Sequence, residues 1–522
     1  MNSLSYESLL EILQYCHSVG NLSLCQSNRL FLHLRSLLSI QICRIYGYEP
    51  IVHVNKRFLI KNVDFCSDYN YKFKNLPQTI KSIKFGREFN QELINLPLLL
   101  ECLSFGGGFN QKLMNLPQSL KCLSFGDGFN QKIKKLPQSL MSITFGCFFN
   151  QKLINLPQSL LSIKFGDDFN HKLNDLPKAL IRIVFGRHFN QEVNNLPNSL
   201  RYIIFGHDFN QPIINLPPSL SQIIFGSNFN HSIIDLPSLL THITFGYYFN
   251  QPLLKLPELL THIVFGETFN QKINHLPKTL THIATNKHFK QNFGDLPDSV
   301  THLTILRYVF NGPFTLLSHT ITHLTFGDYF ASTIYNLPQS ITRLTFGSEF
   351  NQTVKNYPQL LTHVKFGYRF NQKVDNLPQT VTHISFGYQF NQKVDKLPQF
   401  VLHIKFGYKF NVEIDSLPQS ITRLLFGAKF NQRCNHLPQA LTHILFGETF
   451  NQELNNLSDS VTHISFGSDF NQKLDKLPKL LSHIIFGHNF NQQLTNLPKS
   501  VIFISVPKKC KIPKHIRFVH LF

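Results

Sequence analysis

The sequence predicts a repeat solenoid, a parallel β-solenoid of about 22 coils of 20 residues that follows a small all-α module. Two observations carry this prediction. The motif Phe-Gly-x-x-Phe-Asn-Gln returns every 20 residues from Phe85 to Phe486, with one interruption before Phe326. Most of the 51 phenylalanines therefore occupy two fixed places in each unit. Units of this length bury their apolar faces by stacking on their neighbours, which produces a solenoid.

Residues 1–50 contain no repeat and are predicted to be helical. Leu9, Ile12, Leu13 and Cys16 recur at the spacing of one helix face. We therefore expect a separate helical module ahead of the solenoid.

Each coil is predicted to begin with a short strand, because apolar and polar residues alternate before Phe-Gly. In one unit Ile243 and Phe245 should point into the core, whereas His242 and Thr244 should point outward. Gly246 ends the strand, at a turn where we expect a positive φ. The rest of the coil supplies further core residues and a closing proline: Phe249, Leu253, Leu256 and Pro257.

The solenoid is predicted to span residues 51–504, with irregular coils at about 285–325. There Thr285-Asn286 and Ile305-Leu306 replace Phe-Gly, and one extra residue enters the repeat. Residues 505–522 form a basic tail. We interpret this tail as a polar end cap. The alternatives are a nuclear localisation signal or a segment that contacts phosphate.

An asparagine follows the second phenylalanine of nearly every unit, from Asn90 to Asn491. Stacked side chains at this position can hydrogen-bond backbone groups of the adjacent coil, which would otherwise be buried without partners. We therefore assign these asparagines to the scaffold.

The composition favours a chain of the cytoplasm or nucleus that is neither secreted nor inserted in a membrane. No apolar run reaches the roughly 18 residues that a membrane span requires, and the N-terminus lacks the pattern of a signal peptide. Nine scattered cysteines suit a reducing compartment better than a disulfide framework.

The positive charge of the chain makes nucleic acid a possible class of partner. The sequence has 50 Lys and Arg and 30 Asp and Glu, which gives a formal charge of +20. Many lysines, such as Lys112 and Lys373, follow Asn-Gln on the turn toward the outer side, where Glu92 and Glu192 interrupt them. No nucleic-acid-binding motif occurs. A basic nucleic-acid binder is therefore the third hypothesis for this chain and not the expected one.

Catalytic motifs are also absent, including a P-loop, Gly-x-Ser-x-Gly, His-Glu-x-x-His and paired-cysteine metal spacing. Repetition accounts for every frequent polar residue. We expect no enzyme activity, no catalytic residues, no metal site and no cofactor.

A target-binding surface is predicted at the two variable residues that follow each Phe-Gly. Tyrosine and arginine are enriched at binding hot spots. The preferred patch contains Tyr247, Tyr248, Tyr368, Arg369, Tyr388, Tyr408 and Lys409. The alternative is that these residues are solvated turn residues without a binding role.

A column of histidines occupies the outward position of His242 in most later units, and Arg343 and Arg423 interrupt it. The other members are His262, His282, His302, His323, His363, His383, His403, His443, His463 and His483. Neighbouring strands place them about 4.8 Å apart. A metal site, a pH-sensitive surface and a neutral ladder remain open, and the missing acidic or cysteine ligands favour the neutral ladder.

Residues 60–505 resemble the FNIP repeat, a leucine-rich-repeat-like unit. The run Leu-Pro-x-Ser-Leu-Thr-x-Ile-x-Phe-Gly-x-x-Phe-Asn-Gln carries the resemblance, as from Leu417 to Gln432 with like-for-like aliphatic replacements. The unit here is two residues shorter than is usual for the family, between Asn-Gln and Leu-Pro. The resemblance implies a horseshoe with the strands on its concave side.

The first helix of the N-terminal module resembles the opening helix of an F-box, which proteins of this type often carry. The run Leu4-Ser5-Tyr6-Glu7-Ser8-Leu9-Leu10-Glu11-Ile12-Leu13 follows its pattern, although Ser5 replaces a proline and Ser8 an apolar residue. The residues that this resemblance implies for adaptor binding are Leu4, Glu7, Leu9, Leu10, Ile12 and Leu13. A helical cap that closes the solenoid is the alternative.

Together these resemblances imply a non-enzymatic substrate-recognition subunit of a cullin-RING (SCF-type) ubiquitin ligase. The F-box would dock on a Skp-family adaptor, and the repeats would bind a target protein of unknown identity. The alternative is a protein-binding solenoid scaffold that recruits no ligase.

Overall fold

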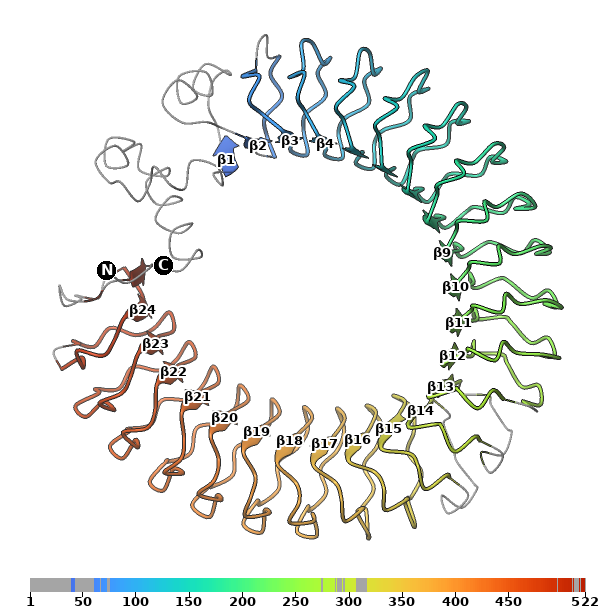
Figure 1. Ribbon diagram of the computed structural model, residues 1–522. Helices are drawn as coiled ribbons and strands as arrows, with labels where there is room; N and C mark the ends of the chain where they lie inside the picture. Colours follow the sequence, from blue (N-terminus) through green and yellow to red (C-terminus); the bar gives the residue numbers. More distant parts are fainter. Residues whose placement is uncertain are drawn as a thin grey trace. The chain divides into compact units, whose positions relative to one another are not determined.

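A computed structural model describes most of the chain as short parallel strands joined by turns (Figure 1). The residues that it describes are 39–42, 61–65, 67–72, 76–273, 276–286, 288, 293, 296–306, 317–494, 496–508, 510, 516 and 518–521. The F-box-like residues 4–13 lie outside them. The chain divides into two compact units, Met1–His231 and Ser232–Phe522. In each unit the strands line the inner edge of a curved stack, and the turns lie outside (Figure 1).

Ten strands lie in the described residues of the first unit. They are β1 (Ser39–Ile42), β2 (Asn62–Phe65), β3 (Ser82–Lys84), β4 (Cys102–Ser104), β5 (Cys122–Ser124), β6 (Ser142–Thr144), β7 (Ser162–Lys164), β8 (Arg182–Val184), β9 (Tyr202–Ile204) and β10 (Gln222–Ile224). Consecutive strands pair in parallel, and from β2 onward the register steps by one repeat, as in Ser82↔Cys102. β1 lies in the segment predicted to be helical. That prediction is wrong for these four residues, where polar and apolar residues alternate as a strand requires.

In the second unit the structure describes fifteen strands. They are β11 (His242–Thr244), β12 (His262–Val264), β13 (His282–Thr285), β14 (His302–Ile305), β15 (His323–Phe326), β16 (Arg343–Thr345), β17 (His363–Lys365), β18 (His383–Ser385), β19 (His403–Lys405), β20 (Arg423–Leu425), β21 (His443–Leu445), β22 (His463–Ser465), β23 (His483–Ile485), β24 (Phe503–Val506) and β25 (Phe518–Leu521). Each pairs in parallel with the next. The predicted basic tail therefore contributes the end of β24 and all of β25.

The core consists of two phenylalanine columns flanked by aliphatic residues, as the repeat predicts. Within one coil the rings of Phe386 and Phe390 stack with their centroids 3.8 Å apart, and Phe386 lies 5.5 Å from Phe406 in the next coil. All three side chains are buried. Burial of one Phe contributes about 1.5 to 3 kcal/mol, whereas ordering each residue costs about 1 to 2 kcal/mol. A single coil therefore cannot be stable without its neighbours.

The glycine of Phe-Gly is required for a different reason from the one predicted. A Cβ at Gly407 would overlap the carbonyl group of Gly387 in the preceding coil, and neither Gly407 nor its counterparts from Gly327 to Gly487 adopt a positive φ. The backbones approach too closely for a side chain. The positive φ values of non-glycine residues occur on the outer turns instead, at Asn95, Asn115, Asn155, Asp175, Asn215 and Asn336. Asparagine and aspartate tolerate this conformation better than other side chains.

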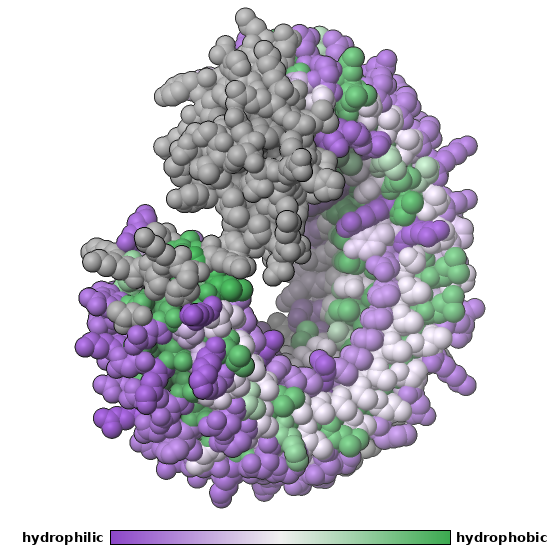
Figure 2. All heavy atoms as spheres, turned by 60° about the vertical axis from the view of Figure 1, so that its left-hand side comes forward, coloured by the Kyte–Doolittle hydropathy of each residue, from purple (hydrophilic) through white to green (hydrophobic). Residues whose placement is uncertain are grey.

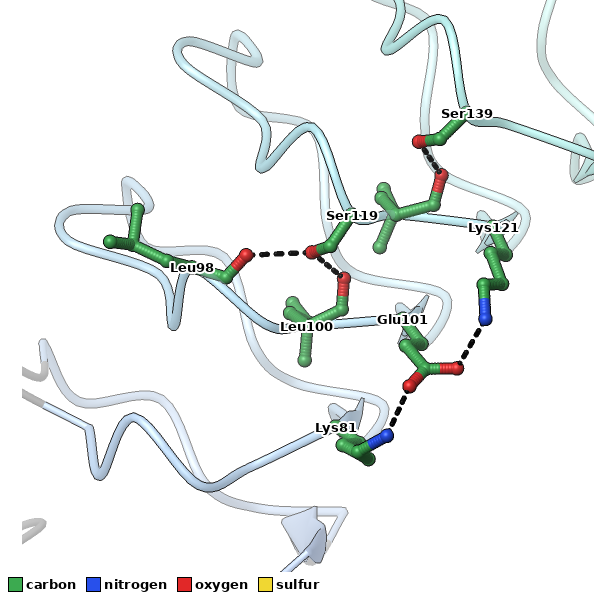
Figure 3. Close-up of polar contacts among 8 residues, drawn as sticks. Lys81, Leu98, Leu100, Glu101, Ser119, Lys121 and Ser139 are labelled. Carbon is green, nitrogen blue, oxygen red and sulfur yellow. Dashed lines mark hydrogen bonds and ion pairs between the residues drawn. The ribbon is translucent and has the colours of Figure 1, made fainter.

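Polar side chains connect successive coils outside the core. The Oδ1 of Asn90 accepts a hydrogen bond from the backbone N–H of Asn110 at 2.9 Å, and this contact repeats along the stack. The scaffold role of the asparagines is confirmed, although Asn110 and many of its counterparts are exposed rather than buried. Ser119 similarly donates to carbonyl groups of the preceding coil, and Glu101 lies between Lys81 and Lys121 (Figure 3).

The irregular coils keep their strands. β13, β14 and β15 are four residues long, one more than their neighbours. At the glycine position Asn286 is buried, and its Nδ2 donates to the carbonyl oxygen of Phe269 at 2.8 Å. Its Oδ1 accepts from the backbone N–H of His288 at 2.8 Å. Side-chain hydrogen bonds therefore hold the turn where the repeat is broken.

Exposed apolar residues are scattered over the surface. In the space-filling view, hydrophobic patches alternate with hydrophilic side chains (Figure 2). Leu98 and Leu254 are each about three-quarters exposed, at 75% and 76%. Within the described ranges, no helix has the length and apolarity needed to cross a membrane.

Candidate functional site

The outward positions of the strands form a face that differs between the two units. In the first unit the first strand position is mostly small or polar, as at Ser82 and Cys102. In the second unit it is histidine in most strands, with Arg343 and Arg423 between them. No described strand from β3 to β25 contains Asp or Glu. The strand face of the second unit is therefore basic and rich in imidazole.

The histidines stack in register, as the parallel pairing requires. The ring centroids of His242 and His262 lie 4.1 Å apart, and those of His363 and His383 also lie 4.1 Å apart with the planes 10° from parallel. His403 is different, because its ring meets that of His383 at 73°. The column is thus continuous over several coils but not uniform.

Hydroxyl groups determine which nitrogen of each neutral imidazole ring carries the hydrogen. Thr362 donates from Oγ1 to the carbonyl oxygen of Thr342 at 3.0 Å, and the same Oγ1 lies 2.9 Å from Nδ1 of His363. A hydroxyl has only one hydrogen, so Nδ1–H must be the donor in the second contact. The Nε2 of His363 is then a hydrogen-bond acceptor. The same pair of contacts involves Thr382 and His383, at 3.2 and 2.8 Å.

His403 lacks this hydroxyl partner. The preceding residue is Leu402, whereas a threonine or serine precedes every other histidine of the column. The hydroxyl positions the ring, so its absence explains why His403 turns edgewise to His383.

The histidines are neutral at physiological pH. Desolvation by partial burial lowers the pKa of His363 to about 4, assisted by the nearby His383 and Arg343. The pKa values of His262 and His302 are also about 4, again mainly through desolvation. These shifts support the neutral ladder among the three interpretations of the column.

The arrangement does not form a metal centre. Among the described residues, no group of three or more His, Cys, Asp or Glu side chains is placed to hold a metal ion. Parallel stacked rings also direct their Nε2 lone pairs side by side rather than toward one point. Chelation by one ion requires converging ligands.

A hollow of about 400 Å³ lies over β16 to β20. His363, His383 and His403 contribute to its lining. The lining also contains four cationic side chains, which are all exposed: Arg343, Lys365, Lys405 and Arg423. None of the four forms an ion pair within the described part of the chain.

The predicted target-binding tyrosines form a second column on the same coils. The rings of Tyr368 and Tyr388 stack at 4.6 Å, and those of Tyr388 and Tyr408 stack at 4.6 Å with planes only 2° apart. Lys429 lies over the ring of Tyr408, with Nζ 5.9 Å from its centroid. Backbone hydrogen bonds between coils hold these turns, as from the N–H of Lys409 to the carbonyl oxygen of Tyr388.

Only part of the predicted patch comes together. Arg369 and Lys409 lie on the turns of the tyrosine column, and Arg369 pairs with Glu349 at 3.0 Å. Tyr247 and Tyr248 are exposed and meet edge to face at 4.8 Å, but they belong to the coil of β11. Six coils separate β11 from β17, or about 29 Å at 4.8 Å per strand. The predicted patch is therefore two separate clusters, Tyr247 and Tyr248 in the coil of β11 and the stacked tyrosine column in the coils of β17 to β19.

Sequence reasoning missed the cationic lining of the hollow. Arg343 and Arg423 were recognised as interruptions of the histidine column, and Lys365 and Lys405 were not singled out. The signal that could have found them is the missing acidic residue at every outward strand position beyond Asp64.

The thiol of Cys102 is not an activated nucleophile. Cys102 and Cys122 are partners in adjacent strands, and both thiols are free. Desolvation, helped by Cys122, raises the pKa of the Cys102 thiol to about 11. That thiol is therefore protonated at neutral pH and a poor nucleophile.

A model of the FNIP Repeat family matches residues 69–288 and 350–509, in successive segments. This is well over half of the chain. The unmatched stretch between them contains most of the irregular coils, whereas Thr285-Asn286 lie at the end of the first matched range. The match does not reach residues 4–13, so the F-box resemblance stays a prediction.

Two solved structures are similar to this chain, and the first of them supports the fold. One described as CroV588, a novel circular LRR protein structure, is 34% identical, with 88% of this chain and 85% of that chain covered and a TM-score of 0.65. YopM from Yersinia enterocolitica WA-314 is 18% identical, with 84% of this chain and 90% of that chain covered and a TM-score of 0.39. No curated protein matches this chain. The predicted leucine-rich-repeat-like solenoid is confirmed.

Proposed function

This chain belongs to the FNIP-repeat family, and from that premise we propose that it is a non-enzymatic scaffold that binds a target protein on the strand face of its second unit and the turns that directly follow these strands. A repeat solenoid of this kind is typical of binding proteins, because it presents an extended surface without a catalytic centre. We propose the cytoplasm or the nucleus as its location.

The stacked tyrosine column is the observation that carries this proposal. Tyr368 is 47% exposed, and its neighbours Tyr388 and Tyr408 are half-buried. Stacking already restricts these side chains, and backbone hydrogen bonds between coils hold the turns that carry them. Binding therefore loses little conformational entropy, which is the property that makes rigid aromatic residues effective anchors.

Alanine replacement of the column tests the proposal. Proteins captured by the intact chain and by the variant Y368A/Y388A/Y408A are quantified by mass spectrometry. The control Y71A/Y335A removes two exposed tyrosines elsewhere. We expect a target that is lost from the triple variant and kept by the control. Equal capture by all three chains would refute the proposal.

A ubiquitin-ligase subunit is the finer form of this proposal. The F-box-like pattern of Leu4, Glu7, Leu9 and Ile12 supports it. In that case the protein would hold its target near a ubiquitin-charged enzyme and raise the effective concentration of the target. The contribution to the ubiquitin conjugation pathway would be recruitment and not catalysis.

Copurification decides between ligase subunit and simple scaffold. We expect the Skp-family adaptor to copurify with the intact chain and to be lost after Leu9→Asp and Ile12→Asp. The target captured through Tyr368 should remain bound to that variant. An adaptor that is absent, or that binds the variant equally well, would leave the scaffold without ligase recruitment.

A further inference from the structure

The hollow over β16 to β20 has positive charge without a counterpart. Its four cationic side chains are exposed and unpaired among the described residues. The five strands beneath it contain no acidic residue. Glu349, on the turn that follows β16, pairs with Arg369 at 3.0 Å. An anionic ligand would meet no repulsion from the floor of this surface.

The floor of the hollow offers hydrogen-bond acceptors. The Nδ1–H groups of His363 and His383 are directed to threonine hydroxyls, so Nε2 of each neutral ring can only accept. A ligand suited to this floor must combine negative charge with N–H or O–H donors. A peptide supplies both, through its side-chain carboxylates and its backbone amides. The DNA backbone supplies the charge but no donor.

The tyrosine column also favours a peptide over a single strand of nucleic acid. Bases bind by stacking on exposed aromatic faces. The faces of Tyr388 are already covered by Tyr368 and Tyr408, each 4.6 Å away. The ring edge and the hydroxyl group of Tyr388 remain for contact with a ligand. These suit polar contacts with a protein.

The dimensions suit an extended chain that crosses the strands. Arg343 and Arg423 lie four coils apart, about 19 Å at 4.8 Å per strand. An extended segment of about six residues spans that distance. Lys365 and Lys405 lie between them on the other outward row, so the two arginines flank the two lysines along the stack.

We propose that the strand face of β16 to β20 binds an extended acidic segment of a partner protein. Its carboxylates pair with the four cationic side chains of the hollow, and its backbone N–H groups donate to Nε2 of His363 and His383. The inference rests on the proposed protein-binding function and names the chemistry of the partner.

A matched pair of charge variants tests this inference. The probe is a short fluorescent peptide of glutamates, and binding is measured by fluorescence anisotropy. The variant K365Q/K405Q removes two lysines of the hollow. The control K84Q/K164Q removes two exposed lysines from the same strand position in β3 and β7 of the first unit. Both variants lose the same net charge.

We expect K365Q/K405Q to bind the probe about fivefold more weakly, since each exposed ion pair contributes modestly. The control should bind like the unmodified chain, and added salt should weaken binding. An equal loss of affinity in both variants would show that net charge alone explains binding, and it would overturn the inference. Tighter, lysine-dependent binding of single-stranded DNA of equal charge would overturn it in favour of nucleic acid.

Binding of the glutamate peptide and capture of the target by Y368A/Y388A/Y408A test the two proposals separately. If the glutamate peptide does not bind, but Y368A/Y388A/Y408A still loses its target, the partner is not acidic and the scaffold function stands. If neither the peptide nor a target depends on these residues, both proposals fail.

Discussion

Two residue types set the geometry of each coil for separate reasons. Glycine after the strand permits close approach of neighbouring backbones, and asparagine on the outer turn supports a left-handed conformation. The repeat therefore contains glycine where space is absent, and asparagine or aspartate occupies the six described outer-turn positions with a positive φ. The periodic Phe-Gly pair reveals that glycine is needed, but not which of these constraints applies.

Replacing Gly407 by alanine should destabilise the stack, because the new Cβ would overlap the carbonyl group of Gly387. We expect a loss of about 1 to 3 kcal/mol, typical of overpacking. Gly107→Ala is the matched control, since a Cβ there meets no atom within 4 Å. Urea denaturation and hydrogen exchange of β18 and β19 measure the effect. Equal stability of both variants would contradict the steric explanation.

At the scale of the strand, the histidine column couples stability to pH. The pKa of His363 in the folded chain is about 4, below its ordinary value of 6.5. The unfolded chain therefore binds more protons between these values. Stability contributed by the neutral ring is complete above pH 6.5 and is lost as the pH falls toward 4.

Lowering the pH from 7 to 5 should reduce the melting temperature of the intact chain. The variant H363Q/H383Q should lose less over the same interval, whereas His319→Gln, at an exposed turn, should behave like the intact chain. Glu101 stays ionised over this interval, because its ion pairs with Lys121 and Lys81 lower its pKa to about 2. An unchanged pH dependence in H363Q/H383Q would show that the column does not titrate as described.

At the scale of the whole molecule, the period of the sequence predicted the solenoid, its strands and its core. Ile243 and Phe245 are buried as the alternation requires. The positions of β1 and the glycine constraint were not predictable, because the first depends on pairing with β2 and the second on the distance between coils. The candidate site was predicted in part. The tyrosines were found, but the hollow needs side chains from five strands.

The two units share one scaffold and differ in their outward residues. Beside the strands, the first unit has alternating charges such as Lys81, Glu101 and Lys121, whereas the second has the threonines that orient the histidines. The core positions are the same in both. Specific recognition therefore depends on the outward positions, and the core serves only to hold them in register.

Lysine acetylation, followed by mass spectrometry with and without the captured target, tests most directly where the target binds. Lys365 and Lys405 lie on the strand face. Lys373, in the same coil as Lys365, and Lys393, in the coil before that of Lys405, are exposed on the outer turns. We expect the target to protect Lys365 and Lys405 and to leave Lys373 and Lys393 reactive. Protection of the outer lysines alone would contradict binding at the strand face.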